Sequence, residues 1–492
     1  MDADRSIRLS AANPLPIWRK IAYGAGDSGF SLTTTALALA YLDFLINVVG
    51  LDPQLAGVSI AVGRIWDAFN DLFVGTLSDR TRSRWGRRRP YLLFGAIPFG
   101  VAFVLMWLVP PSNEQAVLAI YYTAMYVVFD TLFTLVNVPY IALTPELAPS
   151  YDERTSLHSY RMAFSIGLGL VGAIAPLAIV DAVAGSGAPA LSLALSAAEG
   201  EVEGSLEARR AAYALMSIIL AAASVVPVYI TFAATRERPE YQALRAPALR
   251  ESFRIAASNK AFLIAAGVYL LTWMPIDLIQ FVLVFLIRDA LGLGSAERDT
   301  IFLLIFGVAV LALPFWVWLS RRWDKKRAYQ LGMAFLAGVL IALSFVSPGM
   351  VGAIYLLAAL AGVGVSAAHA IPLAILPDTI EWDELRTAHR QEAAYYSVVT
   401  LIQKLVGAAT IALTGTLLAA SGYIQGATPG AITGQPESAL NAIRVLTGPL
   451  PALLFIAGIV LVSFYPISRE RHARIVRALE KKRELRKRVE SA

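Results

Sequence analysis

Two acidic residues within an apolar stretch, accompanied by an arginine, could bind a cation. Arg64, Asp67 and Asp71 are spaced i, i+3 and i+7 along the stretch from Gly57 to Gly75, so they share one face of a helix. A charge at the centre of a bilayer costs roughly 2.5–3.5 kcal/mol on insertion scales, and such residues face other protein or water. The spacing therefore predicts an ion or solute pathway along one side of that helix.

The composition predicts a membrane protein. The chain has 492 residues, of which 57% are hydrophobic and 16% are charged, and its mean hydropathy is +0.60. Soluble domains are about 45–50% apolar and about 25% charged. The lack of cysteine excludes disulfides, thiolate metal sites and cysteine catalysis, and four scattered histidines argue against a zinc site. The polar segment 1–18 has no apolar core of the kind that a signal peptide needs.

Twelve apolar runs have about the 20 residues needed to cross a bilayer. Basic residues cluster after the second, sixth and eighth runs and in the tail, whereas the connections 50–53, 110–115 and 347–349 contain no Lys or Arg. The positive-inside rule then predicts cytoplasmic termini in a plasma (bacterial inner) membrane, and it explains the net charge of +6 without nucleic-acid binding. The predicted spans are 28–49, 54–77, 91–110, 117–145, 160–182, 211–233, 261–287, 299–320, 328–347, 350–376, 394–420 and 443–467.

The two halves of the chain resemble each other. Pro139–Thr155 and Pro372–Thr387 each combine a proline-bounded apolar run with a following charged segment. We expect an all-α membrane protein of twelve transmembrane helices in two pseudo-symmetric six-helix halves, with a binding site near the midplane. Coincidence between two proline-rich loops is the alternative. The expected parts are an N-terminal half 1–233, a cytoplasmic central loop 234–258, a C-terminal half 259–467 and a cytoplasmic basic tail 468–492.

Two sequence runs carry a family resemblance. The loop Gly75–Pro90 contains Arg-Trp-Gly-Arg-Arg-Arg-Pro and resembles the loop motif of the major facilitator superfamily. Together with Arg64–Asp71, it resembles the glycoside–pentoside–hexuronide:cation symporter family, the melibiose permease-like group. Matches at Tyr23–Gly29 and Asn137–Tyr140 extend the resemblance over about residues 20–467. The resemblance implies a major facilitator fold that imports a sugar or glycoside with a cation by alternating access.

Oxygen donors on the second and fourth spans predict the cation site. Asp67, Asn70 and Asp71 offer oxygens on adjacent turns of the second span, and Thr134 offers a hydroxyl on the fourth. A hard cation binds several oxygens at once, whereas a proton needs one carboxylate with a raised pKa. The resemblance places the coupling cation on these four residues and favours Na⁺ over H⁺. The alternative is a structural Arg64–Asp67 ion pair, with Asp71 as a helix cap.

The acidic sugar-binding positions of the family are not matched in this chain. By the resemblance they fall on Ser31 and Asn137, which accept hydrogen bonds less strongly than a carboxylate. Asp27 and Asp130 are candidates to replace them, and Arg161 lies one position from the substrate-facing arginine of the family. Helix-end capping by Asp27 and a contact of Asp130 with a neighbouring helix are the alternatives.

Two further residues could line the solute pocket. Lys404 lies in the middle of the eleventh span and matches the family lysine, so we expect it to pair with Asp67 or Asp71. Trp273 could stack on a sugar ring, although aromatic residues in spans more often pack or form an interfacial belt.

Charged residues at the cytoplasmic helix ends could latch the two halves together. A network is required because one exposed ion pair contributes only about 0–1 kcal/mol. Topology alone explains the arginines but not the acidic residues among them. The basic tail is expected to be a solvated helix, with contact to anionic lipid as the alternative. The latch candidates are Asp79, Arg80, Arg87, Glu146, Arg154, Asp378, Glu381 and Arg390.

These patterns favour a transporter with no cofactor other than the coupling ion. The expected partners are a small solute, the cation and bilayer lipid, and we expect a monomer. A major facilitator carrier for a lipid-like or other amphipathic solute is the alternative, and a non-transporting membrane sensor is the alternative of another class. An enzyme is not expected, because the sequence contains no nucleophile–base pair or metal-ligand cluster.

Overall fold

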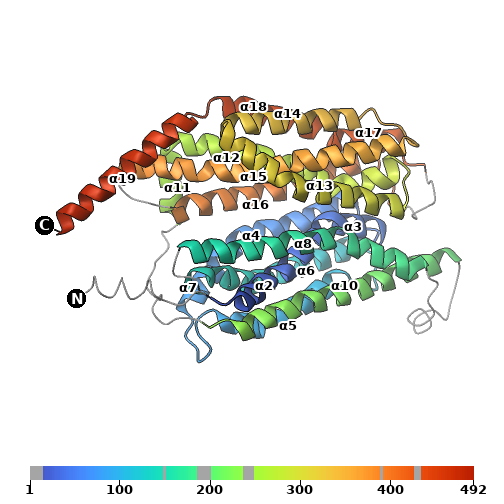
Figure 1. Ribbon diagram of the computed structural model, residues 1–492. Helices are drawn as coiled ribbons and strands as arrows, with labels where there is room; N and C mark the ends of the chain where they lie inside the picture. The colour runs from blue at the N-terminus through green and yellow to red at the C-terminus, as the bar shows by residue number, and fades with distance from the viewer. Residues whose placement is uncertain are drawn as a thin grey trace. The chain divides into compact units, whose positions relative to one another are not determined.

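The protein is built from long helices (Figure 1). The structure, a computed structural model, describes residues 15–147, 151–185, 201–236, 249–387, 392–425 and 434–491. Throughout these residues the chain forms helices and turns, and they contain no strand. The expected all-α class is therefore confirmed.

Eleven helical segments in the described residues are long and apolar enough to cross a membrane. Each coincides with one of the twelve predicted spans. The remaining prediction, residues 54–77, corresponds to a helix of 28 residues, Pro53–Arg80, which carries several charges along its length. These charges make the helix more polar than the other eleven. Each charge that is buried there requires a partner from another helix.

The chain divides into two compact units. The first contains residues up to 244, 294–299 and 411–436, and the second contains 245–293, 300–410 and 437–492. The helices up to residue 234 are α2 (Ile17–Ala36), η1 (Leu37–Tyr41), α3 (Leu42–Asn47), α4 (Pro53–Arg80), α5 (Arg89–Met106), α6 (Gln115–Ala142), α7 (Thr144–Leu147), α8 (Tyr151–Gly185) and α10 (Glu201–Ala234).

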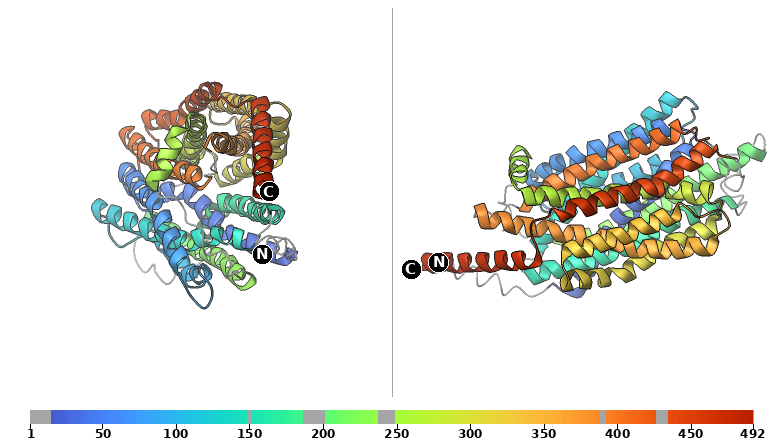
Figure 2. Two further views of the ribbon diagram at one scale, coloured as in Figure 1. Left: turned by 90° about the vertical axis from the view of Figure 1, so that its left-hand side faces the viewer. Right: turned by 90° about the horizontal axis from the view of Figure 1, so that it is seen from above.

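The later helices include one inside the predicted central loop. Residues 237–248 of that loop lie outside the described residues, but α11 (Leu249–Ser258) follows them. The other helices are α12 (Lys260–Phe285), η3 (Leu286–Ala290), α13 (Ser295–Arg322), α14 (Lys325–Leu343), α15 (Val351–Thr387), α16 (Glu392–Ala420), α17 (Glu437–Thr447), α18 (Pro449–Ser463) and α19 (Arg469–Ser491) (Figures 1 and 2).

Three helix pairs of the first half recur in the second half. In each half, the first predicted span packs on the sixth: α2 packs on α10, and α12 packs on α18. The third packs on the fourth and on the sixth, as α5 on α6 and α10, and as α14 on α15 and α18. A π-helical turn occurs in the first span of each half: η1 lies between α2 and α3, and η3 ends the span that α12 begins. Such turns are rare and were not predicted from the sequence.

Glycine explains how α2 packs so closely on its neighbours. A Cβ atom added at Gly29 would lie 2.3 Å from the carbonyl oxygen of Ser224 on α10, and one at Gly24 would lie 3.0 Å from the backbone of Tyr160 on α8. Larger side chains would push these helices apart. The glycines of the Tyr23–Gly29 match therefore have a packing role.

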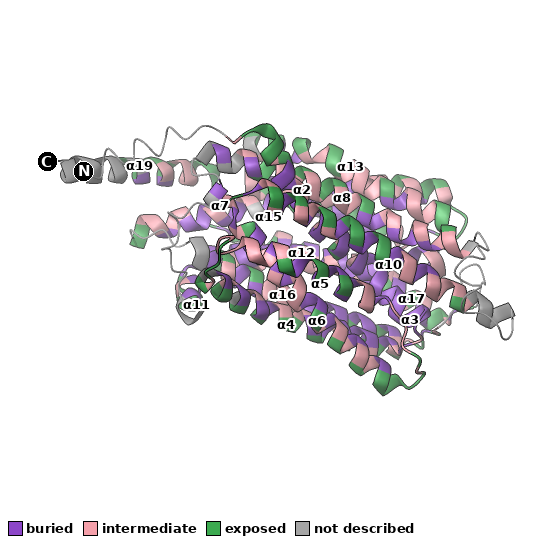
Figure 3. Cartoon of the chain, turned by 90° about the horizontal axis from the view of Figure 1, so that it is seen from below, coloured by how far each residue is buried: buried purple, intermediate pink, exposed green. Residues whose placement is uncertain are grey.

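Large apolar side chains are exposed on the outer helix faces, as expected for a protein in lipid. Phe73 is 68% exposed on α4 and Leu311 is 80% exposed on α13. Figure 3 shows buried and exposed residues following one another along the long helices. A soluble protein rarely leaves extended apolar surfaces of this kind uncovered.

The start of the basic tail is packed rather than solvated. Ile475 and Leu479 on α19 are only 3% and 5% exposed, and both belong to the apolar core of the second unit. The expectation of a solvated tail is therefore wrong for the first turns of α19, because its apolar face covers the end of α15.

Candidate functional site

Helix α4 holds the charged residues of the second span in its interior. The helix begins after Asp52, whose carboxylate accepts hydrogen bonds from two N–H groups of the first turn at 2.8 and 3.3 Å, and Pro53 occupies the first helical position. The helix continues to Arg80. Asp71 lies in the middle of this helix, so the alternative that it caps a helix end is wrong.

The carboxylates of α4 face away from its most exposed side. Asp67 and Asp71 are half-buried, and Asn70 between them is buried. At 100° per residue the apolar exposed side chains lie on the opposite face. Those exposed side chains are Val58, Val62, Ile65, Phe69 and Phe73.

Two hydrogen bonds join the polar face of α4 to α6. The Thr134 hydroxyl donates to Oδ1 of Asp71 at 3.4 Å, and the Asn70 amide donates to the backbone carbonyl of Asp130 at 3.4 Å. A hard cation such as Na⁺ binds oxygen at about 2.4 Å. Two oxygen atoms that lie 3.4 Å apart would then form an angle of roughly 90° at the ion. The Asp71 and Thr134 oxygens therefore have the separation of neighbouring ligands of one cation.

A close approach between α4 and α6 assembles these groups. A Cβ atom at Gly63 would lie 2.1 Å from the ring of Tyr126, so only glycine leaves room for that ring. Tyr126 interacts in turn with Arg64 and experiences the charges of Asp130 and Asp67. The structure thus brings the predicted charges of both spans around one tyrosine.

Further hydrogen bonds fix the register of α4 against α6. The Trp66 indole N–H donates to the Thr131 hydroxyl at 2.9 Å, and the Ser59 hydroxyl donates to the Ala119 carbonyl at 3.3 Å. Residue numbers rise together along both helices, so the helices run parallel. This register keeps Asp71 beside Thr134.

The candidates on α2 lie along its interface with α8. The Asp27 carboxylate is 3.7 Å from Nε of Arg161, and the Ser31 hydroxyl donates to the Ser165 carbonyl at 2.6 Å. Asp27 is in the interior of α2, so the alternative of helix-end capping is wrong. Asn137 is half-buried on α6, three residues beyond Thr134.

In the second unit, aromatic and polar groups gather around Trp273. The ring of Trp273 lies 4.8 Å from that of His369 in a T-shaped arrangement and 6.0 Å from that of Tyr269, whose hydroxyl donates to Gln403 at 2.8 Å. Its indole nitrogen is buried and has no hydrogen-bond partner among the described residues. Lys404, half-buried on α16, follows Gln403, and its pairing with an aspartate of α4 stays a prediction.

Two latch candidates form a charge cluster at the basic end of the second unit. Lys325 Nζ donates to both oxygens of Asp378 at 2.7 and 2.8 Å. His472 on α19 contacts Asp378 at 3.3 Å and Glu381 at 2.8 Å. These contacts lie within the unit, and a latch across the two halves stays a prediction.

The remaining latch candidates are only partly described. Arg80 is exposed and Arg87 is half-buried. The positions of the others lie outside what the structure describes, namely the side chains of Asp79, Glu146 and Arg154, and residue Arg390.

Sequence reasoning missed several members of these clusters. Tyr126 precedes Asp130 by four residues and Thr134 by eight, so its helical spacing could have identified it. His369 is the one histidine in its apolar span, a signal that could also have been used. His472 carried no such signal, because its contact partners are remote in sequence.

These helices and their polar interior define a membrane carrier of the major facilitator fold. A solved structure with this fold, the inward-facing, unoccupied form of a bacterial homologue of the human lysosomal transporter Spinster, has a TM-score of 0.65. It is 14% identical in sequence and covers 96% of this chain and 99% of its own. At that identity the likeness shows the fold alone.

Sequence comparison narrows the class to a family. Residues 22–469 match the family model of the MFS/sugar transport proteins, and the chain belongs to that family. An uncharacterized symporter of Synechocystis sp. is 36% identical over 96% of this chain and 98% of its own length. The sodium-dependent lysophosphatidylcholine symporter 1-A of Danio rerio is 27% identical over 93% of this chain and 87% of its own. The protein is thus an integral membrane transporter related to symporters.

Proposed function

We propose that this protein is a Na⁺-coupled symporter whose cation binds between α4 and α6. The observation that carries the proposal is the 3.4 Å contact between the oxygens of Thr134 and Asp71, next to Asn70 and Asp67. The sodium-dependent symporters among its relatives support Na⁺ over H⁺. The ion is a transported substrate here, and no cofactor is needed.

Cation binding would couple to transport through charge. Arg64, Asp67 and Asp71 together give one face of α4 a net negative charge, which disfavours closing that face into a dry environment. Bound Na⁺ offsets this charge and makes closure possible. When a cation and a solute are bound together, they favour the change from the outward-open to the inward-open state, which neither of them favours alone.

We further propose a sugar or glycoside as the solute. The family to which the chain belongs includes sugar transport proteins. In the first unit, Asn137 and Arg161 offer hydrogen-bonding groups that suit sugar hydroxyls. In the second unit, considered by itself, Trp273 offers an aromatic face of the kind that stacks on a sugar ring. Under this proposal the Trp273 indole N–H, which lacks a protein partner in the described residues, donates to a solute hydroxyl.

A lysophospholipid is the second candidate solute. Its support is the alignment of nearly the whole chain with a sodium-dependent lysophosphatidylcholine symporter. In addition, the Ser31 hydroxyl already donates to Ser165 and is less suited to replace a sugar-binding carboxylate.

Uptake into proteoliposomes tests both parts of the proposal. Radiolabelled glycosides and lysophosphatidylcholine are offered under an inward Na⁺ gradient, under a pH gradient, and with choline replacing Na⁺. Uptake of a glycoside that requires Na⁺ supports the full proposal. Na⁺-dependent uptake of the lysolipid alone keeps the coupling and overturns the sugar, and uptake driven only by the pH gradient overturns Na⁺ coupling.

We also propose that both termini lie in the cytoplasm of a bacterial cell and that the transporter works as a monomer. The chain has no native cysteine, so single cysteines at exposed Arg82 and Arg474 can be labelled without background. Labelling of intact cells by an impermeant thiol reagent at either position would contradict this orientation.

A further inference from the structure

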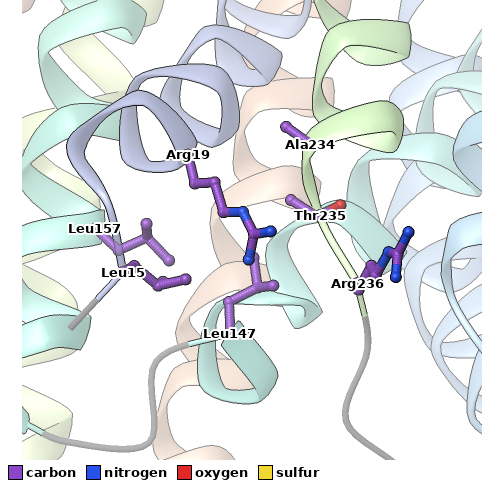
Figure 4. Close-up of a pocket in the computed structure, with 7 residues that line it drawn as sticks. All are labelled: Leu15, Arg19, Leu147, Leu157, Ala234, Thr235 and Arg236. Carbon is purple, nitrogen blue, oxygen red and sulfur yellow. The ribbon is translucent and has the colours of Figure 1, made fainter. Parts of the chain in front are cut away.

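A small cavity at one end of the first unit is lined by two arginines and three leucines. Its volume is about 70 Å³, which is large enough for a few water molecules or a compact oxyanion. Figure 4 shows Arg19 extending between Leu157 and Thr235 toward Leu147, with Arg236 on the other side of Thr235. The lining residues are Leu15, Arg19, Leu147, Leu157, Ala234, Thr235 and Arg236.

Within the described residues, the guanidinium groups of these two arginines have no hydrogen-bond or ion-pair partner. The Arg19 guanidinium lies 5.2 Å from the ring of Trp18, and, apart from bonds within the helix, the only hydrogen bond of Arg19 in the described residues is that of its backbone N–H to the Pro16 carbonyl at 2.9 Å. The ordinary role of Arg236, capping the end of α10, is taken by Arg89, which donates to the Phe232 carbonyl at 2.9 Å. Two exposed cations therefore border one cavity without a compensating anion in the lining.

The neighbouring carboxylate has another partner. Glu153 on α8 is buried and accepts a hydrogen bond from the backbone N–H of Leu15. It does not line the cavity. The Thr235 hydroxyl donates to the Thr231 carbonyl at 2.7 Å, which leaves its oxygen as an acceptor and the two arginines as the donors of the cavity.

The cavity lies at the membrane surface that carries the basic loops. Arg89, which begins α5 directly after the loop 81–88, contacts the last turn of α10 beside the cavity. Ile17, Trp18 and Ile21 on the first turns of α2 are 64%, 57% and 44% exposed. Basic groups next to exposed apolar side chains suit a ligand that has a phosphate in the cavity and its apolar part in the bilayer.

We infer that this cavity binds the phosphate of an anionic membrane lipid through Arg19 and Arg236. Planar guanidinium groups bind phosphate oxygens in a bidentate manner. The leucine side of the cavity would contact the glycerol end of the lipid. The site joins α2, α7, α8 and α10, so an occupant would hold together four helices at one end of the unit.

Lipid binding to the purified protein in detergent tests this inference. Native mass spectrometry compares the wild type with the double variant R19Q/R236Q during titration with phosphatidylglycerol. We expect the tightest phosphatidylglycerol to bind at least about tenfold more weakly in the variant, because the charge-assisted hydrogen bonds of two guanidinium groups to the phosphate are lost. The matched control R254Q/R474Q removes the same charge from two exposed arginines of the second unit and should bind like the wild type.

The other arms identify the ligand and exclude misfolding. Phosphatidylcholine should bind the wild type and the double variant alike, and the charge-preserving variant R19K/R236K should recover part of the affinity. Equal phosphatidylglycerol affinity in R19Q/R236Q and the wild type would overturn the inference. Inorganic phosphate that raises the melting temperature of the wild type alone, without any difference in lipid binding, would overturn the lipid as ligand. Variants are compared only as monodisperse peaks of equal elution volume.

Discussion

Helices α4 and α13 follow the first span of their respective series and each has 28 residues, yet they differ in the middle. The middle of α4 contains the charged residues Arg64, Asp67 and Asp71, whereas residues 301–320 of α13 contain no charged side chain. Both helices end in arginine and lead into a basic segment. Both helices of the repeat thus have a basic end, but only α4 has a charged face. The proposed cation site therefore belongs to the first half of the chain alone.

The largest expected effect is the loss of the carboxylate that sets α4 apart. Asp71→Asn keeps the shape but removes the charge, and Na⁺-driven uptake should fall by about a hundredfold or more, since a charged hydrogen-bonded group contributes about 3 kcal/mol. Uptake is measured in proteoliposomes under a Na⁺ gradient. Asp52→Asn, which alters only the helix cap, is the control, and full Na⁺ stimulation in Asp71→Asn would refute the site.

The reverse substitution should show that α13 cannot hold a charge. Ala309→Asp places a carboxylate in the apolar middle of α13, where insertion costs roughly 2.5–3.5 kcal/mol without partners. We expect a lower yield of folded protein, measured by fluorescence-detected size-exclusion chromatography. Ala309→Ser serves as the polar control. A normal yield for Ala309→Asp would mean that α13 also has a polar environment.

Glycine spacing should matter on α4 and not on α13. Gly63→Ala puts a methyl group against Tyr126, whereas the nearest atom to a Cβ at Gly307 is 4.0 Å away. We expect Gly63→Ala to weaken Na⁺ activation by about tenfold, because crowding a packed site costs about 1–3 kcal/mol. Gly307→Ala should leave Na⁺ activation unchanged. Equal effects of the two variants would argue against the close approach of α4 and α6.

The smallest effect is expected from the neutral ligand. Thr134→Val removes the hydroxyl but keeps nearly the same side-chain shape. The Na⁺ concentration for half-maximal uptake should then rise by roughly five- to tenfold, the usual range for one hydrogen-bonding group. Thr123→Val on the same helix is the matched control. Unchanged Na⁺ activation in Thr134→Val would remove Thr134 from the site.

The length of the apolar runs was enough to predict the spans and the all-α fold, and helical periodicity was enough to predict the polar face of α4. That face depends on residues three and four apart, which one helix brings together whatever surrounds it. Contacts between helices were harder to predict. The Gly63–Tyr126 approach and the Lys325–Asp378–His472 cluster join segments far apart in the chain, and only packing decides them. The π-turns η1 and η3 were missed because no composition marks them.

The docked start of α19 has a practical consequence for handling the protein. Removing residues from 469 onward would uncover the apolar surface beneath Ile475 and Leu479 and take His472 away from Asp378. A truncation for crystallisation or a fusion placed there would expose this apolar surface and promote aggregation. Shortening the chain beyond Leu479 keeps that cover intact, so purification tags belong after this residue.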